Sequence, residues 1–270
     1  MIGAITLTLT LGYAGSGAIG REVLMERLVT IFNLAARGDM LPPGEIHQIR
    51  RALTAGGLCI LPSDTCYALA GNPLIAGVPA LVNSVLDRHE EKISLSFGSQ
   101  PMVERYVDLG YREHRLLDAA DKSTPITLVA AVSTDLPDQV RRALPAALYT
   151  TGELGIRLSQ SWIERQVSSE LDVPVTSAAI YYADGQPVRS FDDAITIVIS
   201  GLLRAQNDET PLVAVRHPPV NSKGVSSVVG YKRDEDGRNV LVVFREGAVE
   251  SRRVIEIAGK LSARDVEDWT

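Results

Sequence analysis

The chain has 270 residues, of which 45% are hydrophobic and only 5% aromatic, so aliphatic side chains must build most of its core. This length allows one large domain or two small ones. A formal net charge of −6 at pH 7 argues against broad, nonspecific binding of nucleic acids. It leaves room for a small basic cleft, because net charge does not describe how charges are distributed.

The two cysteines, Cys59 and Cys66, form no CxxC pair, and the four histidines are scattered along the chain. We therefore expect packed thiols in a reducing compartment and no metal held by the protein. The first eleven residues are apolar but lack the basic start of a signal peptide. No run reaches the roughly 18 apolar residues that cross a bilayer, so we expect a soluble, cytoplasmic protein without a membrane partner.

Residues 1–43 are predicted to form an N-terminal extension packed on the core. The strict alternation over 5–11 predicts a strand, and 21–37 is predicted to be an amphipathic helix. Between them, Gly15-Ser16-Gly17-Ala18-Ile19-Gly20 matches the GxGxxG dinucleotide fingerprint, but no carboxylate follows at the end of a second strand with the required spacing. A glycine-rich turn before a helix is therefore favoured over a dinucleotide-dependent oxidoreductase.

Strand and helix patterns alternate through residues 44–250, which are predicted to form the main domain. Helices are expected over 44–55, 74–87, 101–120, 135–145 and 161–171, and strands over 58–61, 93–97, 126–132, 156–158, 173–176, 225–229 and 240–244. Residues 190–205 are predicted to mix a helix with the strand-like run ITIVIS. A charged tail, 251–270, ends in a helix. Because several connections resemble hairpins, we predict an α/β fold with a twisted, open, mixed parallel and antiparallel sheet.

Hydroxyl and cationic side chains accompany four of these strands. They lie in the segments Pro62-Ser63-Asp64-Thr65-Cys66-Tyr67-Ala68-Leu69, Arg88-His89-Glu90-Glu91-Lys92, Pro125-Ile126-Thr127 and Gly155-Ile156-Arg157-Leu158. Cations and hydroxyls that converge from strand ends suit a polyanion such as a nucleoside triphosphate. Simpler explanations exist for each segment, since Ser63 or Asp64 could cap a helix and most arginines form surface ion pairs.

The order of the segments resembles the YrdC-like threonylcarbamoyl-AMP synthase family over roughly residues 44–250. The family motif Pro-Thr-Asp-Thr-x-Tyr-Gly-Leu aligns with residues 62–69, and Lys-x-Arg-Pro with its later lysine aligns with 86–92. Five further motifs, Pro-Gly-Pro-x-Thr, Arg-x-Pro, Ser-Ala-Asn, Ser-Thr-Val and Leu-Arg-x-Gly-Ala, align with 123–127, 157–159, 177–179, 226–228 and 244–248. Seven motifs in one order make the resemblance more specific than any of them alone.

The resemblance implies a concave, basic cleft in which L-threonine, bicarbonate and ATP give threonylcarbamoyl-AMP and pyrophosphate, for use in tRNA modification. Mg²⁺ is expected to accompany ATP. The implied catalytic residues are Arg88, Lys92 and Arg157, and the implied substrate- or ATP-binding residues are Ser63, Thr65, Tyr67, Pro125, Thr127, Ser177, Ser227 and Arg245. No side chain has to act as a nucleophile, so catalysis depends on positioning and charge stabilisation.

Two positions depart from the family pattern, because Leu86 replaces a lysine and Ala179 replaces an asparagine. The departures leave open a different amino acid or amine, or a carbamoyl adenylate made from carbamoyl phosphate. They also leave open a different class of function, a non-catalytic nucleotide- or RNA-binding module with the same fold.

Overall fold

The computed structural model describes residues 5–11, 25–34, 40–88, 92–122, 124–144, 149–150, 152–207, 209–217, 224–233, 235–236 and 238–259. Its strands are β1 (Ile5–Leu11), β2 (Met25–Asn33), β3 (Leu58–Pro62), β4 (Tyr67–Gly71), β5 (Ser94–Ser96), β6 (Ile126–Ala131), β7 (Tyr149–Thr150), β8 (Glu153–Arg157), β9 (Val175–Ala179), β10 (Leu212–Arg216), β11 (Ser227–Arg233) and β12 (Asn239–Arg245). Its helices are α1 (Pro43–Thr54), α2 (Val78–Val85), α3 (Gln100–Glu104), α4 (Tyr111–Lys122), α5 (Asp138–Ala143), α6 (Trp162–Leu171), α7 (Phe191–Arg204) and α8 (Ser251–Gly259).

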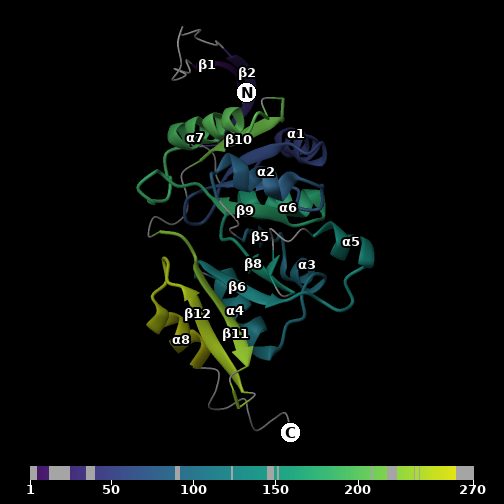
Figure 1. Cartoon of the computed structure of the whole chain (residues 1–270), viewed down its shortest axis with the longest axis vertical. Helices are drawn as coiled ribbons and strands as arrows, with labels where there is room; N and C mark the ends of the chain where they lie inside the picture. The colour runs from purple at the N-terminus through teal and green to yellow at the C-terminus, as the bar shows by residue number, and fades with distance from the viewer. Residues whose placement is uncertain are drawn as a thin grey trace.

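All the described strands belong to one mixed sheet that follows the long axis of the molecule (Figure 1). The strand order is β1-β2-β10-β3-β4-β9-β5-β8-β6-β11-β12, with β7 paired to β8 beside this path. The pairs β2–β10, β10–β3, β5–β8 and β6–β11 are parallel, and the remaining pairs are antiparallel. The predicted fold class, a mixed α/β sheet with helices packed on it, is confirmed.

Helices cover both faces of the sheet around β3. This strand is buried at all five positions, and side chains alternate between faces along a strand. Leu58 and Ile60 join the apolar cluster beneath α2 and α7, whereas Cys59 and Leu61 join the cluster beneath α1 and α6. A strand buried on both faces appears in the sequence as a continuous apolar run, which is why β3 was predicted correctly. Farther along the sheet, α4 packs on β6, and α8 packs on α4 and β12.

The N-terminal region differs from the prediction. Residues 25–33 form strand β2, so the helix predicted over 21–37 is wrong there. Val29 and Ile31 face one apolar cluster while Phe32 faces the other, and apolar residues on both faces hide the alternation that identifies a strand. Strands β1 and β2 therefore extend the main sheet beyond β10. The GxGxxG segment, residues 15–20, lies outside the described residues.

The second correction concerns residues 190–216. The run ITIVIS lies within helix α7, where Ile195, Val198, Ile199 and Leu202 are buried at helical spacing. Ser190 caps this helix by accepting a hydrogen bond from the backbone N–H of Asp193 at 3.3 Å. Its β-branched residues favour strands in general, but here the spacing of the buried face decides the structure. The strand of this region is β10, which was not predicted. Along the described part of the chain, every helix is too short or too polar to cross a bilayer.

Candidate functional site

A cavity of about 390 Å³ lies on one face of the sheet between β4 and β12, a volume within the usual range for small-molecule pockets. Alternate residues of four strands line it: Thr127 and Val129 of β6, Glu153, Gly155 and Arg157 of β8, Ser177 and Ala179 of β9, and Val228 and Lys232 of β11. The residues between them, such as Leu128 and Ile156, are buried in the apolar core on the other face. The site therefore lies on a sheet face and not only at strand ends, the location predicted from the sequence.

Small residues make room for the cavity. Ala68 of β4 and Ala179 of β9 are directly paired and both line it. Gly155 also lines it, and a Cβ atom at that position would stand 3.0 Å from Ser94 Oγ. Larger side chains at these three positions would fill the space, so the small residues of the local sequence make the cavity possible.

The turn between β3 and β4 supplies one wall. Pro62 pairs with Tyr67, so the four residues from Ser63 to Cys66 connect an antiparallel hairpin, and the hypothesis that Ser63 or Asp64 caps a helix is wrong. Ser63 Oγ donates to the carbonyl of Cys66 at 2.7 Å and accepts from the backbone N–H groups of Thr65 and Cys66, both at 3.2 Å. These bonds fix the turn and place Thr65 at the cavity. Burial raises the pKa of the Cys66 thiol, so this cysteine is not an activated nucleophile.

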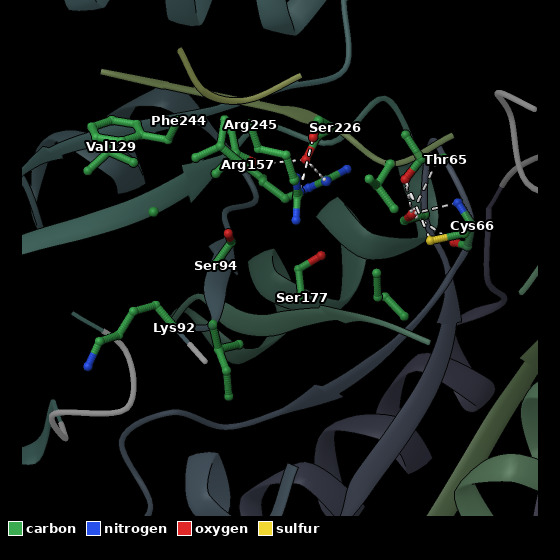
Figure 2. A pocket seen from close by; sticks show the side chains of 18 of the residues that line it. Thr65, Cys66, Lys92, Ser94, Val129, Arg157, Ser177, Ser226, Phe244 and Arg245 are labelled. Carbon is green, nitrogen blue, oxygen red and sulfur yellow. Dashed lines mark hydrogen bonds between the residues drawn. The ribbon is translucent and has the colours of Figure 1, made fainter. Parts of the chain in front are cut away.

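Arg157 joins the turn to the opposite strands. Its side chain is buried, and Nη2 donates to Asp64 Oδ1 in an ion pair. Nη1 donates to Ser226 Oγ at 2.8 Å (Figure 2). Ser226 Oγ also shares a hydrogen bond of 2.7 Å with Thr127 Oγ1. Burial alone would lower the pKa of Arg157, but the carboxylates of Asp64 and Glu164 outweigh it and raise the pKa. The guanidinium therefore stays charged, and these bonds use two of its five N–H donors.

Cationic side chains predominate around the cavity. Among the described lining residues, the charged ones are Arg88, Lys92, Arg157, Lys232, Arg245 and a single carboxylate, Glu153. Arg245 Nη2 donates to the backbone carbonyl of Ser226 at 3.0 Å, and Lys232 Nζ stands 5.0 Å from the centre of the Phe244 ring. In Figure 2, Ser94 and Ser177 lie between Lys92 on one side and Thr65 and Cys66 on the other. Fixed cations on different elements around hydroxyl groups suit a polyanionic ligand.

The structure brings eight of the eleven predicted site residues to this cavity: Ser63, Thr65, Arg88, Lys92, Thr127, Arg157, Ser177 and Arg245. Tyr67, Pro125 and Ser227 are not among its described lining residues. The Tyr67 hydroxyl accepts from the backbone N–H of His217 at 3.0 Å, and its ring packs edge-on against Phe191. The carbonyl of Pro125 accepts from the backbone N–H of Ser227 at 3.0 Å.

Ser227 illustrates how one step along a strand changes the outcome. Its hydroxyl accepts from the backbone N–H groups of Gly247 and Val249, at 3.0 and 3.2 Å, on the face away from the cavity. Its neighbour Ser226 lines the cavity instead. Adjacent residues of an extended segment point to opposite faces, so the aligned motif located the segment but not the residue that faces the ligand.

Several lining residues were missed altogether, among them Ser94, Glu153, Lys232 and Phe244. Lys232 was missed because the strand predicted over 225–229 stops three residues before it, whereas β11 continues to Arg233. Nowhere in the described ranges do three or more His, Cys, Asp or Glu residues gather as a possible metal site.

Solved structures with the same fold come from proteins of low sequence identity. P. abyssi Sua5 in complex with L-threonine matches with a TM-score of 0.64 at 16% identity, over 85% of this chain and 61% of that one. E. coli YciO matches with a TM-score of 0.63 at 16% identity, over 83% of this chain and 98% of that one. Full-length HypF in a phosphate- and nucleotide-bound form matches with a TM-score of 0.53 at 15% identity, over 73% and 28%.

This chain therefore spans nearly all of YciO but less than two thirds of Sua5. No curated protein sequence matches it. The Sua5–YciO–YrdC family model, whose description reads "Telomere recombination", matches residues 51–238, which is more than half of the chain. The resemblance found in the sequence motifs is thus confirmed, and the chain belongs to the Sua5–YciO–YrdC family.

Proposed function

We propose that this protein uses ATP to form a carbamoyl-type adenylate and releases pyrophosphate, with an amino acid and bicarbonate as its other substrates. The observation that carries the proposal is the cavity on the sheet face, where cationic side chains from separate elements surround hydroxyl groups. A triphosphate needs several fixed positive charges, and arginines supply them without losing a proton. Membership of a family that makes threonylcarbamoyl-AMP supports the same reaction.

In the proposed reaction, the amino group of the substrate attacks the carbon of bicarbonate, and water is lost as the carbamate forms. A carbamate oxygen then attacks the α-phosphorus of ATP, and the bond between that phosphorus and the pyrophosphate oxygen breaks. Arg88, Lys92 and Arg157 are assigned to stabilising the charge that builds on the phosphate oxygens. Ser63, Thr65, Thr127 and Arg245 are assigned to holding the substrates. A protonated Cys66 fits this scheme, because no protein nucleophile is required.

Mg²⁺ is expected to arrive with ATP as part of the substrate. Glu153 is the one carboxylate among the described residues that line the cavity. Such a site fits an ion held mostly by phosphate oxygens and water, because Mg²⁺ usually keeps several waters and takes one or two carboxylates from the protein.

The missing family lysine has a structural counterpart. Leu86, which replaces it, packs against the apolar core and is not among the described cavity residues. Lys232 enters the same cavity from β11. We assign Lys232 to the negative charge that the family lysine would otherwise contact, since an ammonium at the end of a flexible stem can approach a phosphate from another strand.

The decisive experiment is pyrophosphate release from ATP with a panel of amino acids, with and without bicarbonate. L-Threonine belongs in the panel because P. abyssi Sua5 has been solved with it. Release that depends on both bicarbonate and one amino acid supports the proposal. Arg233→Ala is a matched control for Lys232→Ala, because Arg233 is the exposed neighbour of Lys232 and does not line the cavity.

The second candidate is a non-catalytic nucleotide- or RNA-binding module, which the loss of the family asparagine at Ala179 favours. Ala179 lines the cavity, so an amide that could donate and accept hydrogen bonds is missing from the site. Binding of ATP or RNA without pyrophosphate release under any substrate combination would support this candidate and contradict the enzymatic proposal.

A further inference from the structure

A buried glutamate lies directly behind the cavity wall. Glu164 follows Ser161 by three residues at the start of α6, a spacing typical of a capping box in which the glutamate binds the backbone N–H of the cap residue. Here the backbone N–H of Ser161 donates to Ser159 Oγ at 3.1 Å. Glu164 is fully buried, and its Oε1 accepts a hydrogen bond of 2.6 Å from Ser177 Oγ. Its carboxyl group therefore reaches Ser177 of β9 instead of the backbone N–H of the cap residue.

Ser177 connects this glutamate to the cavity. It lies opposite Ser94 in the β5–β9 pair, and both line the cavity (Figure 2). A serine hydroxyl has one proton and two acceptor positions, and Ser177 uses its proton on Glu164. The oxygen that remains for a ligand is an acceptor. Two residues farther along the same strand, Ala179 offers no polar group. Ser177 is thus the polar group that β9 presents to a ligand.

Burying this carboxylate has a cost that its local surroundings offset only in part. The charged groups that act on the Glu164 carboxyl are Arg157 and Asp64, which already form an ion pair with each other. A buried carboxylate without a cation of its own is unfavourable, although the first turn of a helix partly stabilises it. An apolar residue of similar size would fill the same space without that cost. An apolar residue, however, could not accept the hydrogen bond that Glu164 accepts from Ser177.

We propose that Glu164 is a positioning residue for Ser177. It orients the Ser177 hydroxyl so that its oxygen accepts a hydrogen bond from the amino group of the amino-acid substrate. This inference rests on the proposed function and narrows it, because the group received at Ser177 must carry an N–H. The substrate class is therefore an amine with at least one N–H, such as an α-amino acid. A carboxylate or a carbonyl at the same place would meet an acceptor facing an acceptor.

The test compares L-threonine with its N,N,N-trimethyl derivative, which has no N–H, as ligands in calorimetric titrations with ATP present. Titrations run at pH 8, on the alkaline side of neutrality, because burial raises the pKa of Glu164 and the inference concerns its carboxylate form. Ser177→Ala and Glu164→Leu should each weaken L-threonine binding about tenfold, the worth of one hydrogen bond, and leave the trimethyl derivative unchanged. Glu164→Gln keeps an oxygen that accepts from Ser177 and should restore most of the affinity. Ser169→Ala, an exposed serine of the same helix, is the control.

The double variant Ser177→Ala with Glu164→Leu separates positioning from a merely structural role. If Glu164 acts through Ser177, the double variant binds L-threonine no more weakly than either single variant. Additive losses, or equal losses for the trimethyl derivative, would overturn the inference. Should Glu164→Leu fail to fold, unchanged L-threonine affinity in Ser177→Ala would overturn it as well. ATP is titrated first without amino acid: if ATP does not bind, the proposed function fails, whereas normal ATP binding with no effect of Ser177→Ala refutes this inference alone.

Discussion

Replacing Arg157 by alanine is expected to reduce the stability of the protein as well as its affinity for ATP. The guanidinium and the Asp64 carboxylate are 7% and 3% exposed, so the ion pair is buried. Removing one partner of a buried pair leaves the other charge uncompensated and costs about 3–5 kcal/mol. A domain of ordinary stability has only about 5–15 kcal/mol in total. We therefore expect Arg157→Ala to be folded but markedly less stable.

Two further variants separate the charge from the hydrogen bonds. Arg157→Lys keeps a cation near Asp64 but loses the contact with Ser226, which should cost about 1–2 kcal/mol. Combining Asp64→Asn with Arg157→Leu removes both charges, and replacing a buried pair by groups of similar volume is often close to neutral. This double variant should therefore be more stable than Arg157→Ala, although it changes two side chains instead of one.

Urea unfolding followed by circular dichroism measures these differences, and the slope with urea concentration should stay constant among the variants. A loss below about 1 kcal/mol in Arg157→Ala is what an exposed pair would give, and it would refute the buried network. ATP affinity is measured on the same proteins under conditions where all are folded. There, Arg157→Ala should lose about ten- to a hundredfold, and Arg157→Lys should recover stability better than affinity, because the fork of N–H donors is absent.

Three other outcomes are expected. Lys232→Ala should weaken ATP binding about two- to fivefold at low salt and less at high salt, as for an exposed charge, with Arg233→Ala unchanged in the same titration. Burial raises the pKa of Glu164, so its folded pKa lies above its unfolded pKa. The free energy of unfolding of the wild type, relative to that of Glu164→Gln, should therefore be highest below the unfolded pKa. It should fall as pH rises through the folded pKa. A flat difference between pH 4 and 8 would contradict this. Gly155→Val should abolish ATP binding while a thermal melt still shows a folded protein, because the new side chain occupies the cavity beside Ser94; unchanged ATP affinity would place the ligand elsewhere.

The parts of the fold that the sequence predicted are those whose pattern depends on short-range neighbours. Helix α1 shows its buried face as Ile46, Ile49 and Leu53, and β3 is a continuous apolar run between a glycine pair and a proline. Strand β4 was missed because its five small or apolar residues are buried on both faces and give no alternation. Strand β10 was missed for a similar reason, since it lies in the sheet interior between β2 and β3.

The site was predicted to the level of segments, and its remaining details depend on how strands pair. The parallel register of β11 against β6 sets Ser227 beside Ile126 and Val228 beside Thr127. This register decides that Val228 and Lys232 share the cavity face with Thr127, while Ser227 points to the other side. Sequence motifs carry no information on register between distant strands, so Lys232 and Phe244 could not be assigned to the site before the pairing was known.

The two departures from the family pattern affect different substrates of the proposed reaction, ATP and the amine. Leu86 removes an ammonium, and Lys232 brings one to the same cavity from another strand. Ala179 removes an amide, and Ser177, held by Glu164, supplies a polar group on the same face of β9. If both assignments hold, losses at Lys232 should appear as salt-dependent changes in ATP affinity, and losses at Ser177 as changes in amine affinity. Because a charge acts over several ångströms while a hydrogen bond requires contact, the two sets of variants should also respond differently to salt. If the Lys232 and Ser177 variants both change the affinity for the same ligand, the ATP and amine positions in this cavity overlap.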